Sequence, residues 1–237
     1  IKSFTSKIPL IVIGNLTIGG TGKTPLVKYI AKELMAKGYK PGIVSRGYGG
    51  QFKKTLKVTV ETSVKETGDE AQILSKLGIP FYIDKNRVRA VKELLKNNDC
   101  DVILSDDGLQ HYKMGRNIEI AVIDGKRRFG NNLTFPAGPL RESKNRLKTV
   151  DFIVNNSGPT DEGEYLMSIS PTKFVHLKSG KSYSVENWPM HNQVHAVAGL
   201  GNPGRFFELL ARLGFDIIRH PFQEHHNFHE QDIHYLD

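Results

Sequence analysis

Residues 8–25 read Ile8-Pro-Leu-Ile-Val-Ile-Gly-Asn-Leu-Thr-Ile-Gly-Gly-Thr-Gly-Lys-Thr-Pro25 in this chain of 237 residues. The apolar run at 8–13 predicts a buried strand, and the apolar spacing over 25–37 predicts a helix. Between them lies a glycine-rich loop, 17–24, that ends in Gly-Lys-Thr. A glycine-rich loop between a strand and a helix is the context of a P-loop, so we expect it to bind a nucleoside triphosphate.

The residue types in this loop suit phosphate binding. Glycines let backbone N–H groups approach phosphates closely, and a helix N-terminus adds partial positive charge. We expect Lys23 to reach the β- and γ-phosphates and the Thr24 hydroxyl to ligate Mg²⁺. Thr17 stands where the general pattern has glycine, and an ordinary glycine turn is the alternative. The expected nucleotide-binding residues are Thr17, Ile18, Gly19, Gly20, Thr21, Gly22, Lys23 and Thr24.

Apolar runs and helical segments alternate along the chain, which predicts an α/β fold with a mostly parallel sheet, a P-loop NTPase core. Expected strands are 8–13, 42–45, 81–83, 102–104, 118–123 and 151–154, and expected helices are 25–37, 69–77 and 87–96. The polar stretch 155–164 resembles a linker, so we expect a core over 1–155 and a smaller C-terminal α/β lobe over 156–237. In that lobe we expect strand structure within 168–177, strands at 194–198 and 216–220, and a helix at 203–213.

The composition favours some classes of binding partner and excludes some kinds of structure. The net charge of +8 favours anionic partners, namely nucleotides, phosphorylated substrates, nucleic acid or acidic lipid. Cys100 is the single cysteine, which excludes a disulfide framework and a zinc finger within the chain and fits a reducing compartment. No apolar run approaches the roughly 18–20 residues that span a bilayer. The chain starts at Ile1, so an upstream segment is expected to be missing.

Asp106 and Asp107 follow the apolar run 102–104. A carboxylate at the carboxyl end of a strand beside a P-loop is the Walker B arrangement, which holds Mg²⁺ directly or through water. Two adjacent carboxylates also repel each other, which gives a cation a physical reason to bind there. We therefore expect both residues in a metal site, and a solvated Asp-Asp-Gly turn is the alternative.

Acid–base candidates lie in two further segments. Asp69 and Glu70 open an expected helix, where Asp69 either caps the helix or accepts the proton of a substrate hydroxyl. The stretch Glu224–His229 contains three histidines but lacks the companion ligands of a zinc site. It is either an acid–base element, in which a histidine and a carboxylate orient each other, or a solvated polar loop.

Basic residues surround the segment 135–140. They are Lys126–Arg128, Arg141, Lys144, Arg146 and Lys148, with Arg46 in a separate glycine-rich loop. Such residues bind a substrate phosphate or an acidic lipid, or they form a solvated basic face.

Several separated motifs together resemble the tetraacyldisaccharide 4'-kinase family of lipid A biosynthesis. They are Gly14-Asn-Leu-Thr-Ile-Gly-Gly-Thr-Gly-Lys-Thr-Pro25, Ser45-Arg-Gly-Tyr-Gly-Gly50, Gly68-Asp-Glu70, Ser105-Asp-Asp-Gly-Leu-Gln-His111, Phe135-Pro-Ala-Gly-Pro-Leu-Arg-Glu142 and Ala198-Gly-Leu-Gly-Asn-Pro203. The set covers nearly the whole chain, and Thr17 is normal for this family.

The resemblance implies ATP and Mg²⁺ as cofactors and transfer of the γ-phosphate to the 4'-hydroxyl of a tetraacylated disaccharide 1-phosphate, giving lipid IVA. It implies Asp69 as the base, paired with His225, with Lys23 and Glu70 also catalytic. It also implies peripheral contact with the cytoplasmic face of a bacterial inner membrane. Family members usually carry an apolar N-terminal helix and continue beyond the position of Asp237, so both ends are expected to be short here.

Two other functions share the phosphate loop. A GTP-dependent switch needs a base-reading Asn-Lys-x-Asp motif, which the sequence lacks. A nucleic-acid-binding module predicts salt-dependent oligonucleotide binding and leaves the Gly-Asp-Glu motif without a role. We expect a monomer with no nucleic-acid partner.

Overall fold

The computed structural model describes residues 3–188, 192–223 and 226–235. It contains two compact units, Ile1–Ser168 and Ile169–Asp237. Each unit is described by itself below.

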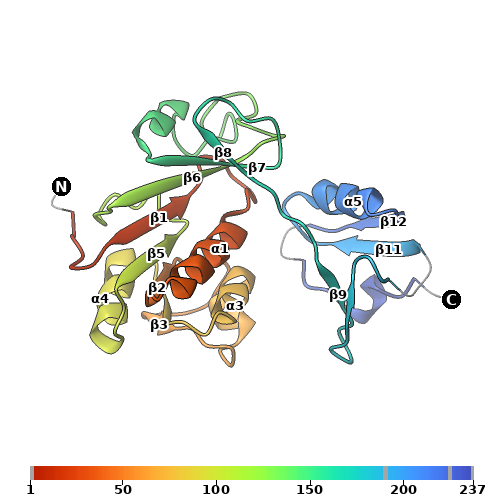
Figure 1. Cartoon of the computed structure of the whole chain (residues 1–237), viewed down its shortest axis with the longest axis horizontal. Coiled ribbons are helices and arrows are strands. Elements are labelled where there is room, and N and C mark those ends of the chain that lie inside the picture. The colour runs from red at the N-terminus through yellow and green to blue at the C-terminus, as the bar shows by residue number, and fades with distance from the viewer. Residues whose placement is uncertain (1–2, 189–191, 224–225, 236–237) are drawn as a thin grey trace. The chain divides into compact units, whose positions relative to one another are not determined.

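The first unit is an α/β domain around one eight-stranded sheet (Figure 1). Its strands are β1 (Leu10–Gly14), β2 (Pro41–Ser45), β3 (Leu56–Lys57), β4 (Phe81–Ile83), β5 (Val102–Asp106), β6 (Ile118–Asp124), β7 (Phe152–Asn156) and β8 (Glu164–Met167). Its helices are α1 (Lys23–Ala36), α2 (Val64–Thr67), α3 (Asp69–Ser75), α4 (Arg87–Asn97) and the 3-10 helix η1 (Lys144–Thr149). The order is β3-β4-β2-β5-β1-β6-β7-β8, and only β3 runs antiparallel to its neighbour. The expected mostly parallel α/β fold is confirmed.

Side chains alternate between the two faces of this sheet, as the geometry of a strand requires. In β1, Leu10 and Val12 join the cluster that contains α4, while Ile13 joins the cluster that contains α1 and α3. Both clusters are built mostly from buried aliphatic side chains, with the aromatic rings of Tyr82 and Phe129 in the first and of Phe81 in the second. Helices therefore cover both faces, and β1 lies in the interior of the sheet between β5 and β6.

The second unit is smaller. Strands β9 (Lys173–Val175) and β10 (Ser182–Ser184) form an antiparallel pair, and β11 (Gln193–Ala198) and β12 (Asp216–Pro221) form a parallel pair. Helix α5 (Pro203–Arg212) connects β11 to β12, and the 3-10 helix η2 (Glu230–Asp232) follows. The expected smaller C-terminal α/β lobe is therefore present, and the strand structure expected within 168–177 is limited to β9.

The boundary between the units lies after Ser168, and the position expected near residue 156 falls inside the first unit. Strand β8 causes the difference, because it pairs with β7 and extends the large sheet. The polar stretch 157–163 is thus a loop between two strands of one sheet. Its glycine, proline and acidic residues suit a tight loop as well as they suit a linker.

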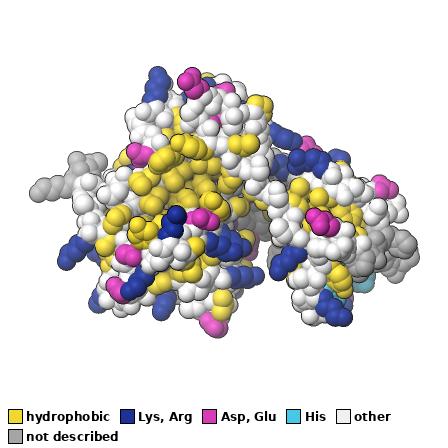
Figure 2. Space-filling model, in the orientation of Figure 1, with side chains coloured by type: hydrophobic (Ala, Val, Ile, Leu, Met, Phe, Trp, Pro, Cys, Tyr) yellow, Lys and Arg dark blue, Asp and Glu magenta, His cyan; other side chains and the backbone are white. Residues whose placement is uncertain are grey.

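Among the described residues, no helix is long and apolar enough to cross a bilayer. The face shown in Figure 2 carries a gathered area of hydrophobic side chains on the first unit. Lys and Arg side chains are spread over this face of both units and do not form one continuous stripe.

Candidate active site

The chemistry-bearing residues of the first unit gather at the carboxyl edge of the sheet. The phosphate loop follows β1. Asp106 ends the neighbouring strand β5, where it is paired in register with Ile13, and Asp107 lies in the turn directly after the strand. Parallel strands place their carboxyl ends at the same edge, where α/β proteins bind ligands. The structure therefore brings together the loop and the aspartate pair, which the sequence predicted separately.

The phosphate loop has the backbone conformation that its glycines allow. Gly19 and Gly22 have φ angles of 93° and 95°, in the left-handed region that favours glycine. Helix α1 begins at Lys23, directly after Gly22. The N–H groups of 19–22 donate to no backbone carbonyl of the described residues, so they can serve an anion.

Two cations hold Asp107 beside the loop. The Lys23 Nζ atom lies 3.5 Å from the Asp107 Oδ1 atom, and Arg141 donates to both carboxylate oxygens at 2.8 and 3.0 Å. Burial acts to raise the pKa of Asp107, but Lys23 and Arg141 outweigh it, so the pKa lies below its usual value. Asp107 is therefore an anion at neutral pH, pinned between the loop lysine and the 135–142 motif.

Asp106 is almost completely buried, with 1% of its surface exposed. Its Oδ2 atom accepts a hydrogen bond from the Ser45 hydroxyl at 3.1 Å, while Oδ1 has no partner among the described residues. Burial, together with the negative charge of Glu70, raises the pKa of Asp106 to about 6. A buried carboxylate oxygen without a partner is the kind of group that a cation satisfies.

Mg²⁺ fits this donor set. It commonly uses one or two protein carboxylates and completes its shell with substrate phosphates and water. In the part of the chain that the structure describes, no three His, Cys, Asp or Glu side chains form a metal cage. A cation shared with a bound triphosphate therefore suits Asp106, Asp107 and Thr24 better than a cation held by the protein alone.

Arg87 is a buried residue of this site that the sequence did not reveal. It donates from Nη2 to the carbonyl oxygens of Asp106 and Asp107 at 3.0 and 3.2 Å, and from Nη1 to that of Asp84 at 3.2 Å. Burial lowers the pKa of Arg87 to about 10, which leaves it charged at neutral pH. Its position at the start of the predicted helix 87–96 did not indicate a buried role, because an arginine at the start of a helix is usually exposed.

The Gly-Asp-Glu motif lies against the Ser45–Gly50 loop. Gly68 has a φ of 81°, and a Cβ atom there would lie 2.0 Å from the Tyr48 carbonyl oxygen. Asp69 is the first residue of α3, and Gly68 holds the N-cap position, so Asp69 and Glu70 form the acidic first turn of this helix. Glu70 is close enough to Asp106 for its charge to act on it.

The histidine segment is described only in part. Glu224 and His225 lie outside the described residues, so the structure does not place the expected partner of Asp69. The neighbouring His226 has its Nε2 atom 3.0 Å from the Asp232 Oδ2 atom, within the second unit. His226 therefore has a carboxylate partner of its own.

Much of the basic stretch is engaged within the protein. Arg127 donates to the Ile18 carbonyl at 3.1 Å, and Arg128 pairs with Glu164 at 2.8 Å and with Asp161. Arg146 pairs with Glu119. The alternative of a solvated basic face is therefore wrong for these arginines, which connect loops at the edge of the sheet.

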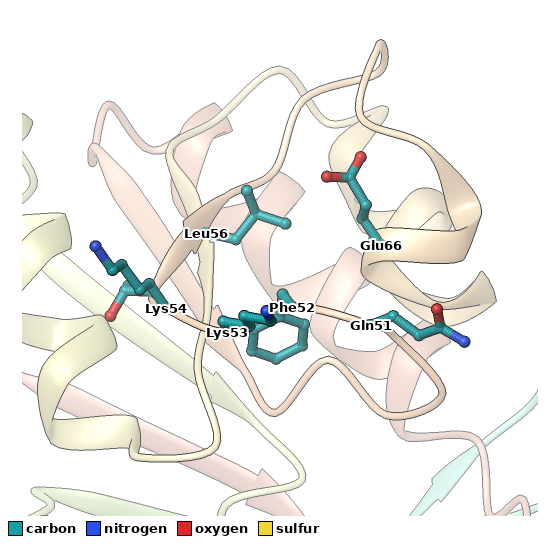
Figure 3. A pocket seen from close by; sticks show the side chains of 7 residues that line it. Gln51, Phe52, Lys53, Lys54, Leu56 and Glu66 are labelled. Atoms are coloured by element: carbon teal, nitrogen blue, oxygen red, sulfur yellow. The ribbon is translucent and has the colours of Figure 1, made fainter.

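A separate pocket of about 670 Å³ lies between the segment after Gly50 and helix α2 (Figure 3). It is lined by Gln51, Phe52, Lys53, Lys54, Thr55, Leu56 and Glu66. None of the predicted site residues lines it.

Comparison with known proteins identifies the family. The sequence model of the LpxK family, described as tetraacyldisaccharide-1-P 4'-kinase, matches residues 1–237. The chain belongs to this family. The membership confirms the resemblance in the sequence and the expected class of enzyme, a kinase of lipid A biosynthesis.

Individual relatives agree with this assignment. A tetraacyldisaccharide 4'-kinase of Methylobacillus flagellatus is 44% identical over 234 residues, which cover 98% of this chain and 70% of that protein. Another, of Ruthia magnifica, is 46% identical over 233 residues, covering 98% and 73%. The crystal structure of "apo" LpxK from Aquifex aeolicus in complex with ATP matches with a TM-score of 0.76 at 28% identity, covering 95% of this chain and 74% of that one.

Proposed function

We propose that this chain transfers the γ-phosphate of ATP to the 4'-hydroxyl of a tetraacylated glucosamine disaccharide 1-phosphate, giving lipid IVA. The observation that carries the proposal is the meeting of the phosphate loop with Asp106 and Asp107 at one edge of the sheet, in a member of the 4'-kinase family. The solved relative that contains ATP supports ATP as the phosphate donor.

In this proposal the residues Thr17–Thr24 hold the triphosphate through backbone N–H groups, and Lys23 lies beside the transferred phosphate. The Lys23 Nζ atom is 3.5 Å from Asp107, so the aspartate holds the ammonium group beside the loop before the triphosphate binds. Fixed donors of this kind stabilise the charge that develops during phosphoryl transfer.

Thr24, Asp106 and Asp107 are the residues that would hold Mg²⁺. When bound, Mg²⁺ neutralises charge on the β- and γ-phosphate oxygens. The protein contributes the orientation of the carboxylates. Arg87 fixes the backbone of both aspartates, and Ser45 occupies one oxygen of Asp106.

Asp69 is proposed as the base that accepts the proton of the 4'-hydroxyl, with His225 as the partner that orients it. Support comes from the placement of the Gly-Asp-Glu motif, since Glu70 lies within electrostatic reach of Asp106. The 4'-hydroxyl is a poor nucleophile while protonated, so a carboxylate beside it accelerates transfer.

We propose that the chain works as a monomer without a nucleic-acid partner, in peripheral contact with the cytoplasmic face of the inner membrane, and the lipid substrate of the family supports the membrane contact.

The test measures transfer of labelled phosphate from ATP to the purified disaccharide lipid, with simple sugars and water as competing acceptors. We expect product with the lipid and a loss of about 100-fold or more in Asp69→Asn, in line with the loss of a general base. Asp99→Asn is the matched control, because Asp99 is an exposed carboxylate that pairs with Lys40. Full transfer by Asp69→Asn contradicts the role of Asp69, and hydrolysis without lipid product contradicts the acceptor.

A further inference from the structure

Side chains from outside the phosphate loop hold its carbonyl oxygens. Asn15 donates from Nδ2 to the carbonyl oxygens of Thr17 and Gly19 at 2.8 and 3.3 Å. Arg127, in the turn after β6, donates to the carbonyl oxygen of Ile18 at 3.1 Å. Side chains therefore hold the carbonyl oxygens of Thr17, Ile18 and Gly19 in the first half of the loop, and the Ile18 N–H donates to the Pro139 carbonyl at 2.8 Å.

Asn156 does the same for the second half of the loop. It ends β7 and donates from Nδ2 to the carbonyl oxygen of Thr21 at 2.9 Å, across 135 residues of sequence. Only 1% of its surface is exposed. A Cβ atom at Gly22 would lie 2.2 Å from the Asn156 Nδ2 atom, so the amide is packed directly against the last glycine of the loop.

Through the geometry of the peptide bond, this contact also orients an N–H group that can donate a hydrogen bond to a phosphate. In a trans peptide the C=O and the following N–H point in opposite directions. Holding the Thr21 carbonyl therefore aims the Gly22 N–H to the other side, away from Asn156. Gly22 has a φ of 95°, and glycine reaches other conformations at little cost, so this peptide would otherwise be free to turn over.

We propose that Asn156 is a positioning residue for the triphosphate, which keeps the Thr21–Gly22 peptide turned so that its N–H faces the nucleotide. The proposal rests on the proposed function only in taking the loop as the ATP site. Asn156 acts through the Thr21 carbonyl and does not touch the phosphates.

The residue type fits this role. A carboxamide supplies an N–H donor without adding charge. Aspartate has the same shape but only acceptors when ionised, so it would face the Thr21 carbonyl with a negative charge close to the bound phosphates. Alanine would leave that carbonyl without its donor and the glycine peptide without its neighbour.

Asn155 is a matched control within the same strand. It is fully buried, and its Nδ2 atom donates to the Pro159 carbonyl at 2.7 Å and to Glu164 at 2.8 Å. These contacts hold the loop between β7 and β8 and do not involve the phosphate loop. Asn155→Ala and Asn156→Ala therefore remove the same group from equally buried positions, and only the second change affects the ATP site.

The experiment measures the dissociation constant for Mg·ATP on the full chain, the thermal unfolding midpoint, and KM for ATP and for the disaccharide lipid. We expect Asn156→Ala and Asn156→Asp each to weaken Mg·ATP binding about 10-fold or more, the scale of one buried hydrogen bond. KM for ATP rises with it, and KM for the lipid is unchanged. Asn155→Ala should lower the unfolding midpoint while its affinity for Mg·ATP stays within about twofold, because its lost contacts lie outside the loop.

Wild-type affinity in Asn156→Asp overturns the proposal, as does an equal loss of affinity in Asn155→Ala. If Asn156→Ala does not fold, Asn156→Leu takes its place, because leucine is similar in size and uncharged but has no donor for the Thr21 carbonyl: weakened Mg·ATP binding supports the proposal, and wild-type affinity overturns it. ATP binding and lipid phosphorylation are measured separately. If the affinity for Mg·ATP depends on Asn156 but no phosphate is transferred to the lipid, the result contradicts the proposed acceptor. The role inferred for Asn156 is then still supported.

Discussion

The two compact units differ in how much of their interior is packed. The first has a hydrophobic cluster on each face of an eight-stranded sheet. The cluster of the second unit contains four buried side chains among the described residues, Ala196, Ala198, Phe207 and Leu210. Because buried apolar area supplies most of the stabilising free energy, we expect the first unit to be the more stable.

This difference in packing bears on where the proposed nucleotide site lies. The phosphate loop, the aspartate pair and Arg87 all lie in the well-packed unit, where donors are held in place before a ligand arrives. The predictions below test whether nucleotide binding depends on the first unit alone.

The largest expected effect on the rate of phosphate transfer comes from the charge of Asp106 in the first unit. Asp106→Asn keeps the size of the side chain and its contact with Ser45, but removes the charge beside the proposed metal. We expect phosphate transfer to fall about 10²–10³-fold, the usual scale for one preorganised electrostatic group. The measurement is single-turnover transfer at saturating Mg·ATP and lipid.

Asp101→Asn serves as its control, because Asp101 precedes β5 at the opposite end of that strand and accepts from the Lys40 N–H. Its transfer rate should match the wild type. Equal losses in the two variants would mean that the effect of Asp106 is not specific to the carboxyl edge.

The next effect separates the stabilities of the units. Phe207→Ala and Phe81→Ala each remove a buried aromatic ring, one from each unit, at a cost of about 3–5 kcal/mol. The single tryptophan, Trp188, packs on Phe174 and Phe215 in the second unit, so its fluorescence reports that unit. We expect Phe207→Ala to lower the transition seen by Trp188 while Mg·ATP binding persists.

Phe81→Ala should give the opposite pattern, with Mg·ATP binding lost at a lower temperature than in the wild type. If Trp188 fluorescence and Mg·ATP binding are lost at the same temperature in both variants, the two units unfold together. Their stabilities would then not differ.

A smaller effect concerns the geometry of the proposed base. Gly68→Ala brings a Cβ atom 2.0 Å from the Tyr48 carbonyl oxygen, so either Tyr48 or the start of α3 must move. We expect transfer to fall about 10–100-fold, as displacement of a catalytic group by about 1 Å does. Affinity for Mg·ATP should change little, and equilibrium binding measures it.

Gly78→Ala is the matched control, because Gly78 also has a positive φ, of 70°, but open space where its Cβ would lie. The control carries the backbone strain without the collision. If both variants lose the same activity, strain alone explains the loss and the position of Asp69 does not matter.

The smallest effect is on the pH dependence of the first unit. Burial acts to raise the pKa of Asp84, but hydrogen bonds from Arg89, Thr55 and the Asn86 N–H outweigh it, so the pKa lies below its usual value. A lowered folded-state pKa gives stability that is present above the unfolded-state pKa, about 4, and is lost as the pH falls through the folded-state pKa. Asp84→Asn should therefore cost about 1–2 kcal/mol at pH 7.

Below about pH 4 the difference between Asp84→Asn and the wild type should shrink, because the unfolded state then binds a proton that the folded state takes up only below the lowered pKa of Asp84. Urea unfolding of the first unit at pH 7, 5 and 3 measures it. A difference that is constant over this range would contradict the assignment to the Asp84 charge.

The sequence predicted the parts of the fold that local patterns encode. The strand, glycine loop and helix over 8–37 lie within two residues of their observed bounds, as do the expected strands 42–45 and 102–104. The family followed from motifs along the whole chain. The local pattern failed at 157–163, because a polar loop between two strands of one sheet has the same composition as a linker between domains.

By itself, the sequence determined the phosphate loop, the aspartate pair and the Gly-Asp-Glu motif, because each is a short run whose residue types carry its chemistry. Only the tertiary structure showed that Arg87, Arg127 and Asn156 hold the backbone of that site. Each donates to a main-chain carbonyl of a distant segment. Every residue has a carbonyl, so such a contact leaves no trace in the sequence of its acceptor, and its donor is recognised only once the chain has folded.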